Sequence, residues 1–142
     1  MTEEQQTKIR WLNRAFHAEK AARAWLAKLE RDKALAERIT RGTSDMHGSS
    51  GSNSTEDALL RLAQTEEETQ ARLRELVAIR DEITAAVKSL EDQDMQAILV
   101  RRYLAYEKME LIAEKMHYDL RTIQRKHKAA LDAIVIECHP ET

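Results

Sequence analysis

The residues best suited to chemistry in this chain lie in one short basic stretch, residues 121–128. Arg121, Gln124, Arg125 and Lys128 recur at steps of three and four, which places them on one face of a helix. Arg can donate two hydrogen bonds to O6 and N7 of guanine, and Gln can pair with N6 and N7 of adenine. Together with Thr122 in the same turns, the stretch predicts a helix that reads base edges in the major groove of DNA.

Two helices joined by a tight turn are predicted to position these side chains, over about residues 107–117 and 120–137. Asp119 is a good N-cap for the second helix. The residues expected to face inward are apolar: Ile112, Ala113, Met116 and Ile123. A short helix followed by a capped basic helix is typical of a helix-turn-helix. The competing interpretation is that residues 121–128 form only a solvated charged surface.

The charge of the chain is unevenly distributed, although its net value is only −2. Residues 95–131 contain eight Lys and Arg side chains but only four acidic ones, whereas residues 1–91 are close to neutral. A local positive excess of this kind suits contact with a polyanion through one part of the surface. The pattern favours a local DNA contact over a wholly basic protein.

Residues 1–91 predict a long antiparallel helical hairpin. All three glycines lie within residues 42–53, a Gly/Ser-rich segment that we expect to be a flexible loop. Apolar residues recur at alternating steps of four and three on both sides of it, which predicts helices over 5–41 and 55–90. Ser54 with Asp57 resembles a capping box at the start of the second helix. Equal helices joined by a flexible loop indicate a coiled coil, closed within one chain or between two.

The seam of this hairpin follows from the same spacing. On the first helix it comprises Trp11, Ala15, Ala18, Ala22, Trp25, Leu29, Asp32, Ala36 and Ile39. On the second helix it comprises Leu62, Glu66, Thr69, Leu73, Leu76, Arg80, Ile83, Val87 and Leu90. A compact three-helix module over 92–137 and a tail over 138–142 follow, and Asp92 or Asp94 would cap the first helix of the module. The predicted fold is all-α.

The C-terminal third carries a recognisable series of residues. It has an Arg-Tyr-Leu turn at 102–104, an Ile-Ala pair at 112–113, and a capped helix from Asp119 with Arg125, His127, Ala130 and Leu131 in regular positions. In this order the run AILVRRYLAYEKMELIAEKMHYDLRTIQRKHKAAL resembles region 4 of bacterial sigma factors. It is more similar still to phage late-transcription regulators of the ArpU/RinA type. The departures are Met109 for a usual Trp, Lys126 for an apolar residue and His117 for a turn glycine.

The resemblance implies a sequence-specific transcription regulator of phage or prophage type, which binds double-stranded DNA through the 120–128 helix and contacts RNA polymerase. The residues expected to read bases are Arg121, Thr122, Gln124 and Arg125. The residues expected to contact phosphates are Lys128, Arg101, Arg102 and Lys108. We expect the N-terminal helices to form a homodimer, which would present two such modules to two half-sites.

No residues of this sequence suggest catalysis, a cofactor or a metal site. It has no glycine-rich phosphate loop or nucleophile elbow, and His117 and His127 do not have a zinc-ligand spacing. His127 is instead expected to be a structural histidine that packs or hydrogen-bonds within the module. The single Cys138 fits a reducing compartment, and no apolar run is long enough to cross a bilayer. We therefore expect a cytoplasmic protein that is not an enzyme and does not contact membranes.

Two other functions remain open from the sequence. A small terminase subunit, which recognises phage DNA for packaging, also combines helix-turn-helix and coiled-coil segments, and it would form a ring-like oligomer. A helical adaptor would use the same basic helix to bind an acidic protein partner. Salt-dependent affinity for a preferred DNA sequence would eliminate the adaptor, and the mass of the particle in solution would separate the terminase subunit from the regulator.

Overall fold

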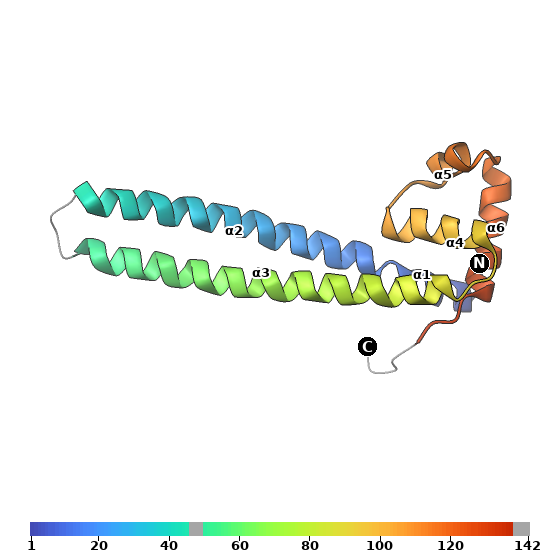
Figure 1. Cartoon of the computed structure of the whole chain (residues 1–142), viewed down its shortest axis with the longest axis horizontal. Coiled ribbons are helices and arrows are strands. Elements are labelled where there is room, and N and C mark those ends of the chain that lie inside the picture. The colour runs from blue at the N-terminus through green and yellow to red at the C-terminus, as the bar shows by residue number, and fades with distance from the viewer. Residues whose placement is uncertain (46–49, 138–142) are drawn as a thin grey trace. The chain divides into compact units, whose positions relative to one another are not determined.

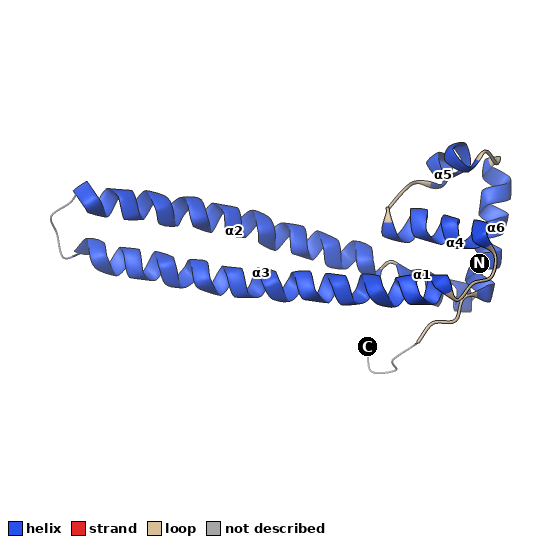
Figure 2. Ribbon diagram, in the orientation of Figure 1, coloured by secondary structure: helices blue, strands red, loops and turns tan. Residues whose placement is uncertain are grey.

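The computed structural model describes residues 1–45 and 50–137, and every regular element in these two ranges is a helix (Figure 1, Figure 2). In chain order they are α1 Glu3–Leu12, α2 Arg14–Asp45, α3 Ser50–Lys88, α4 Gln93–Leu99, the π-helical turn η1 Val100–Leu104, α5 Met109–Met116 and α6 Leu120–Ala133. The all-α prediction is confirmed for these residues. The chain separates into two compact units, one formed by Met1–His17 with the chain from Val77 onward, the other by Ala18–Leu76.

The second unit consists of two long antiparallel helical segments, one from α2 and one from α3 (Figure 1). Its contact layer is partly polar. Asp32 Oδ2 accepts hydrogen bonds from Thr65 Oγ1 at 2.6 Å and from Lys28 Nζ at 2.8 Å. These bonds, first from Lys28 and then from Thr65, lower the pKa of Asp32. Thr69 Oγ1 donates to the carbonyl oxygen of Trp25 at 3.3 Å, so polar pairs fix the register of the two helices.

The predicted seam is largely confirmed by burial, with one clear error. All the predicted seam residues of the first helical stretch are buried or half-buried. On α3, however, Glu66 is exposed and Thr65 takes the buried position. Burial of an unpaired carboxylate would be costly, whereas the Thr65 hydroxyl is satisfied by Asp32. The seam therefore steps by four residues from Thr65 to Thr69, where three had been expected.

Several predicted helix boundaries are wrong. Residues 42–45 continue α2 and residues 50–53 begin α3, so most of the predicted loop 42–53 is helical, while residues 46–49 lie outside the described residues. Ser54 and Asp57 are consequently inside α3 and do not start it. A Gly or Ser costs a helix at most about 1 kcal/mol relative to Ala, which a long packed helix can absorb. The predicted tail 138–142 also lies outside the described residues.

The expected continuous helix over 5–41 is broken at Asn13, which separates α1 from α2. Asn favours helix ends because its side chain competes with the helix for backbone hydrogen bonds. At the other end of the chain, α6 stops at Ala133 and does not reach residue 137. Ile134 is extended and only 1% exposed, so it leaves the helix to fill the core.

The first unit has a core shared by its two chain segments. Leu12 and Ala15 from the N-terminal segment pack with Ile83 and Val87 of α3, and with residues of α4, η1 and α6 (Leu99, Tyr103, Ala130 and Leu131). The predicted boundary between residues 91 and 92 therefore falls inside this unit. The N-terminal helix and the end of α3 are part of the structure that supports α6.

A second, smaller cluster packs beneath the start of α6. It contains Ile98 of α4, Ile112 and Ala113 of α5, and Ile123 of α6, all of them buried. Burial was predicted for Ile112, Ala113 and Ile123, and the fourth residue predicted to face inward, Met116, is half-buried against the same cluster. Asp92 caps α4 by accepting a hydrogen bond from the backbone N–H of Met95 at 3.0 Å, which confirms one of the two predicted caps. The four residues join α4, α5 and α6 into one small apolar centre.

Candidate nucleic-acid interface

α5 and α6 are connected by a short turn whose geometry is locally determined. His117 ends α5 in the left-handed conformation, at φ 62° and ψ 39°, where His is among the tolerated residues. The backbone N–H of Tyr118 donates to the carbonyl oxygen of Ala113 at 3.0 Å and closes the helix end. Asp119 then accepts a hydrogen bond from the backbone N–H of Thr122 at 3.0 Å, so the predicted N-cap of α6 is confirmed. Hydrogen bonding to Thr122 lowers the pKa of Asp119 and keeps the cap ionised.

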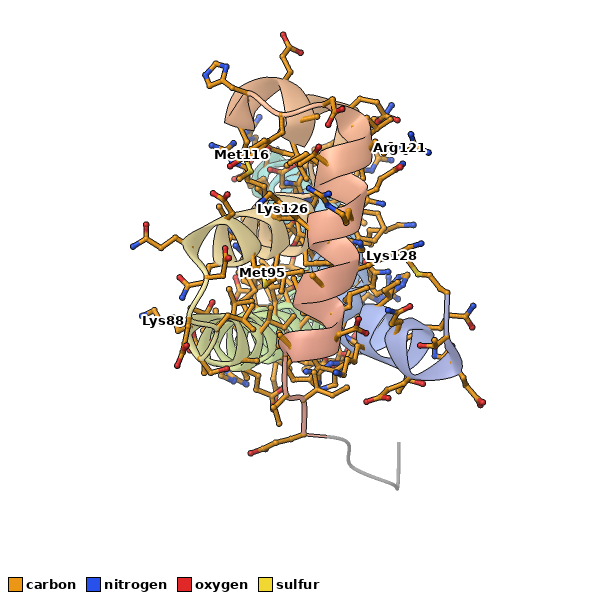
Figure 3. The ribbon with its side chains drawn as sticks, turned by 90° about the vertical axis from the view of Figure 1, so that its right-hand side faces the viewer. Lys88, Met95, Met116, Arg121, Lys126 and Lys128 are labelled. Carbon is orange, nitrogen blue, oxygen red and sulfur yellow. The ribbon has the colours of Figure 1, made fainter. Side chains whose placement is uncertain are left out.

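The capped helix α6 has one buried face and one exposed basic face. The buried face contains Ile123, His127, Ala130 and Leu131. Arg121, Gln124, Arg125 and Lys128 are exposed, and Thr122 is half-buried beside them. Figure 3 shows Arg121 and Lys128 on the same side of α6. The helix therefore separates its apolar and basic residues as the spacing predicts.

These five predicted residues of α6 come together around one shallow hollow on the surface, and no described residue of another element lines it. We call this surface the α6 face. Within the described part of the chain, no side chain forms an ion pair or hydrogen bond with Arg121, Gln124, Arg125 or Lys128. Three cations without a bound carboxylate give this surface a positive potential that an anion can satisfy.

Lys126 is the one cation of α6 that turns to the other side of the helix (Figure 3). Its Nζ lies 3.4 Å from Asp94 Oδ2 and 5.1 Å from the centre of the Tyr118 ring. The Tyr118 hydroxyl donates to the same carboxylate oxygen at 2.6 Å, and this bond, ahead of Lys126, lowers the pKa of Asp94. Lys126 thus joins α6 to α4 in a position where the resembling families carry an apolar residue.

No protein family, curated protein or solved structure matches this chain. No helix among the described residues is long and apolar enough to cross a membrane. In those same residues, no three His, Cys, Asp or Glu side chains are grouped so that they could hold a metal ion.

The three cations predicted on neighbouring elements have different surroundings. Arg101 Nη1 pairs with Glu107 Oε1 at 3.2 Å, and Lys115 Nζ pairs with the other oxygen of Glu107 at 2.9 Å. The hydrogen bond from Lys115, then that from Arg101, lowers the pKa of Glu107. Arg102 Nη1 donates to the Glu107 carbonyl oxygen at 3.1 Å and also borders a second hollow beside α6. Lys108 is exposed just before α5.

Of these three, the structure brings only Arg102 next to residues of the α6 face, because Arg102 shares the second hollow with Gln124 and Lys128. Arg101 and Lys108 line neither of the two hollows. The ion pair with Glu107 gives Arg101 a structural partner that the sequence did not reveal. Phosphate contact by Arg101 or Lys108 consequently stays a prediction.

His127 is a structural histidine, as predicted. Its Nε2 lies 2.7 Å from the Tyr103 hydroxyl, and both side chains are buried. Burial lowers the pKa of His127 to about 4 and raises that of Tyr103 to about 12, so both groups are neutral near pH 7. The pair joins η1 to α6 beneath the basic surface.

The sequence did not predict that residues of α1 contact the end of α6, because residues 5–41 were predicted to form one helix of the hairpin. Gln5 Nε2 donates to Asp132 Oδ1 at 2.8 Å, and Lys8 Nζ donates to the carbonyl oxygen of Leu131 at 2.8 Å, so α1 holds the end of α6. One local signal was present: Thr2 and Gln5 form a capping box, which marks the start of a separate helix.

Proposed function

We propose that this protein is a sequence-specific DNA-binding transcription regulator of phage type, in which α5 and α6 form a helix-turn-helix. In this proposal α6 enters the major groove of double-stranded DNA. The observation that carries the proposal is the α6 face: a capped helix holds two arginines, a lysine and a glutamine on one exposed side, and none of the three cations forms an ion pair with a described acidic side chain. Its opposite side is anchored in the core by Ile123 and His127.

Each residue has a distinct role in this proposal. Arg121, Gln124 and Arg125 lie in the first turns of α6, the part of a recognition helix that meets base edges. Lys128 is one turn further along and Arg102 lies beside it, which suits contacts with phosphates. The resemblance to sigma region 4 adds RNA polymerase as a second proposed partner.

Two substitutions test the DNA contact on a site selected from a random pool. Arg125→Ala should reduce discrimination between the selected site and unrelated DNA by about 1–3 kcal/mol, because a base contact is lost. Lys128→Ala should weaken binding to all duplexes about equally and reduce the dependence on salt, because a phosphate contact is lost. Fluorescence anisotropy at several salt concentrations measures both effects.

A third substitution, Lys88→Ala, is the matched control, since Lys88 is exposed in the same unit but lies on the other side of α6 from Lys128 in Figure 3. It should leave affinity and discrimination unchanged. Unchanged discrimination in Arg125→Ala, or an equal loss in Lys88→Ala, would contradict the proposed role of α6.

The second unit is proposed to form the homodimer contact. Its surface exposes several large apolar side chains: Leu26, Leu35, Leu59 and Leu60. Residues 18–45 contain seven basic and five acidic residues, whereas residues 50–76 contain three basic and six acidic residues. Two copies related by a twofold axis can therefore match a basic helix with an acidic one. A solution mass of two chains would support this contact, a single chain would oppose it, and a larger ring would favour DNA packaging.

A further inference from the structure

A second hollow lies in the first unit, beside the α6 face. It has a volume of about 440 Å³ and is formed by side chains from α1, η1, α5 and α6 together with Met1 and Asn13. This size falls within the range of small-molecule sites in proteins. Nothing in the proposed DNA contact requires the α1 residues that form one wall of it.

The walls of this hollow combine apolar and hydrogen-bonding groups. Ile9, Met109 and the ring of Tyr103 supply apolar surface. Asn13 and Gln124 supply amide groups, and neither amide has a side-chain hydrogen bond within the described part of the chain. Such a mixture of apolar surface and a few convergent polar groups is typical of a ligand site.

The charge of the hollow is positive. Arg102 and Lys128 both line it, and no acidic side chain of the described residues does. Arg102 uses one Nη to bind the Glu107 carbonyl oxygen, which leaves its remaining N–H groups for another acceptor. Lys128 forms no ion pair with a described residue. Two cations without a carboxylate between them favour an anionic ligand.

His127 also lines the hollow, although its side chain is largely buried and its Nε2 lies 2.7 Å from the Tyr103 hydroxyl. Where Tyr103 donates to Nε2, the neutral ring carries its proton on Nδ1.

We propose that this hollow binds a small organic anion, with a phosphate or carboxylate group carried on a flat apolar body. The apolar body would lie against Ile9 and Met109, and the anionic group would bind between Arg102 and Lys128. Gln124 and Lys128 belong to both hollows, so a bound anion would compete with DNA. This competition rests on the proposed DNA-binding function, whereas binding of the anion does not.

The test uses the full chain and three probes: adenosine monophosphate, adenosine and inorganic phosphate. Isothermal titration should show adenosine monophosphate binding at least about tenfold more tightly than either of the others, because only it engages both the apolar wall and the cations. Arg102→Gln and Lys128→Gln should each weaken its binding about tenfold. Lys88→Gln is the matched control, since Lys88 is exposed in the same unit and does not line the hollow, and binding should be unchanged.

Three results would overturn the inference. They are no binding of adenosine monophosphate, equal binding of inorganic phosphate alone, and equal weakening by Lys88→Gln and Arg102→Gln. A DNA phosphate is the other source of the same anionic group, and DNA titrations separate the two sources. If Arg102→Gln weakens DNA binding while adenosine monophosphate does not bind to wild type, the hollow contacts the DNA backbone. In that case the proposed anion site is refuted, and the proposed DNA-binding function stands.

The opposite result would leave the anion site in place. If adenosine monophosphate binds as expected but no duplex binds at any sequence, then the proposed DNA-binding function fails and the anion site stands. If both bind, saturation with adenosine monophosphate should lower the affinity for the selected DNA site in wild type. Arg102→Gln should largely remove that inhibition, because it weakens adenosine monophosphate binding about tenfold. Any loss of its own DNA affinity, through the proposed phosphate contact of Arg102, is measured in the titration without adenosine monophosphate.

Discussion

Mild acid should destabilise the first unit through a single residue, His127. The side chain is 4% exposed, and burial, with a smaller effect from the Arg102 charge, lowers its pKa from 6.5 to about 4. Between these two pH values the unfolded chain binds a proton at His127 while the folded chain does not. The stability that neutral His127 contributes is therefore fully present above pH 6.5 and is lost as the pH falls towards 4.

The size of this effect follows from the pKa difference. A lowering from 6.5 to about 4 corresponds to about 3 kcal/mol of unfolding free energy, of which about 2 kcal/mol should be lost by pH 5. This is a large part of the total free energy of unfolding of a domain, which is usually about 5–15 kcal/mol. Asp94, Glu107 and Asp119 have pKa values below their ordinary range, so they remain ionised in this interval.

Urea unfolding of wild type and His127→Gln at pH 7.5 and pH 5 measures this effect. Gln keeps a polar group near the Tyr103 hydroxyl but does not titrate. Between pH 7.5 and pH 5 the free energy of unfolding should therefore fall by about 2 kcal/mol less in the variant than in wild type, whatever the stability of the variant at pH 7.5. The exposed histidines 17 and 117 are present in both proteins and cancel in the comparison. The same pH dependence in both proteins would refute the account of a buried neutral imidazole.

The remaining predictions concern the anchoring and capping of α6. Ile123→Ala should lower the free energy of unfolding by about 2–4 kcal/mol, because this fully buried residue joins α4, α5 and α6; a urea titration that showed no loss would contradict that role. Asp119→Ala should cost about 1 kcal/mol and reduce DNA affinity by fraying the first turn, whereas Asp119→Asn should retain most of both. If Asp119→Ala lowered the DNA affinity without lowering the free energy of unfolding, Asp119 would act by some means other than capping.

The features of the site that could be predicted from the sequence are local ones. Asp119 and Asp92 cap helices through hydrogen bonds that span three residues, so a short stretch of sequence determines them. The burial of Ile123 and the exposure of Arg125 follow from helical spacing alone. The positive φ of His117 follows from its place between two helices.

Features that depend on distant residues were not predictable in this way. Lys8 and Gln5 are buried because they bind the end of α6, more than 120 residues away in the chain. Helical spacing gave no reason to expect a buried lysine. The pair formed by Tyr103 and His127 also joins residues on two different elements, η1 and α6. Only the packing of the first unit brings such residues together.

The support around α6 decides how its substitutions should be interpreted. The helix is held at its start by Ile123, at its middle by Lys126 with Asp94, and at its end by Lys8. The Arg125 side chain takes part in none of these three contacts, so its truncation leaves them in place. Any effect of Arg125→Ala on DNA must then come from the lost side chain itself. Lys126 is different: although it is as basic as its neighbours, its loss would act on the proposed DNA binding through the contact between α6 and α4.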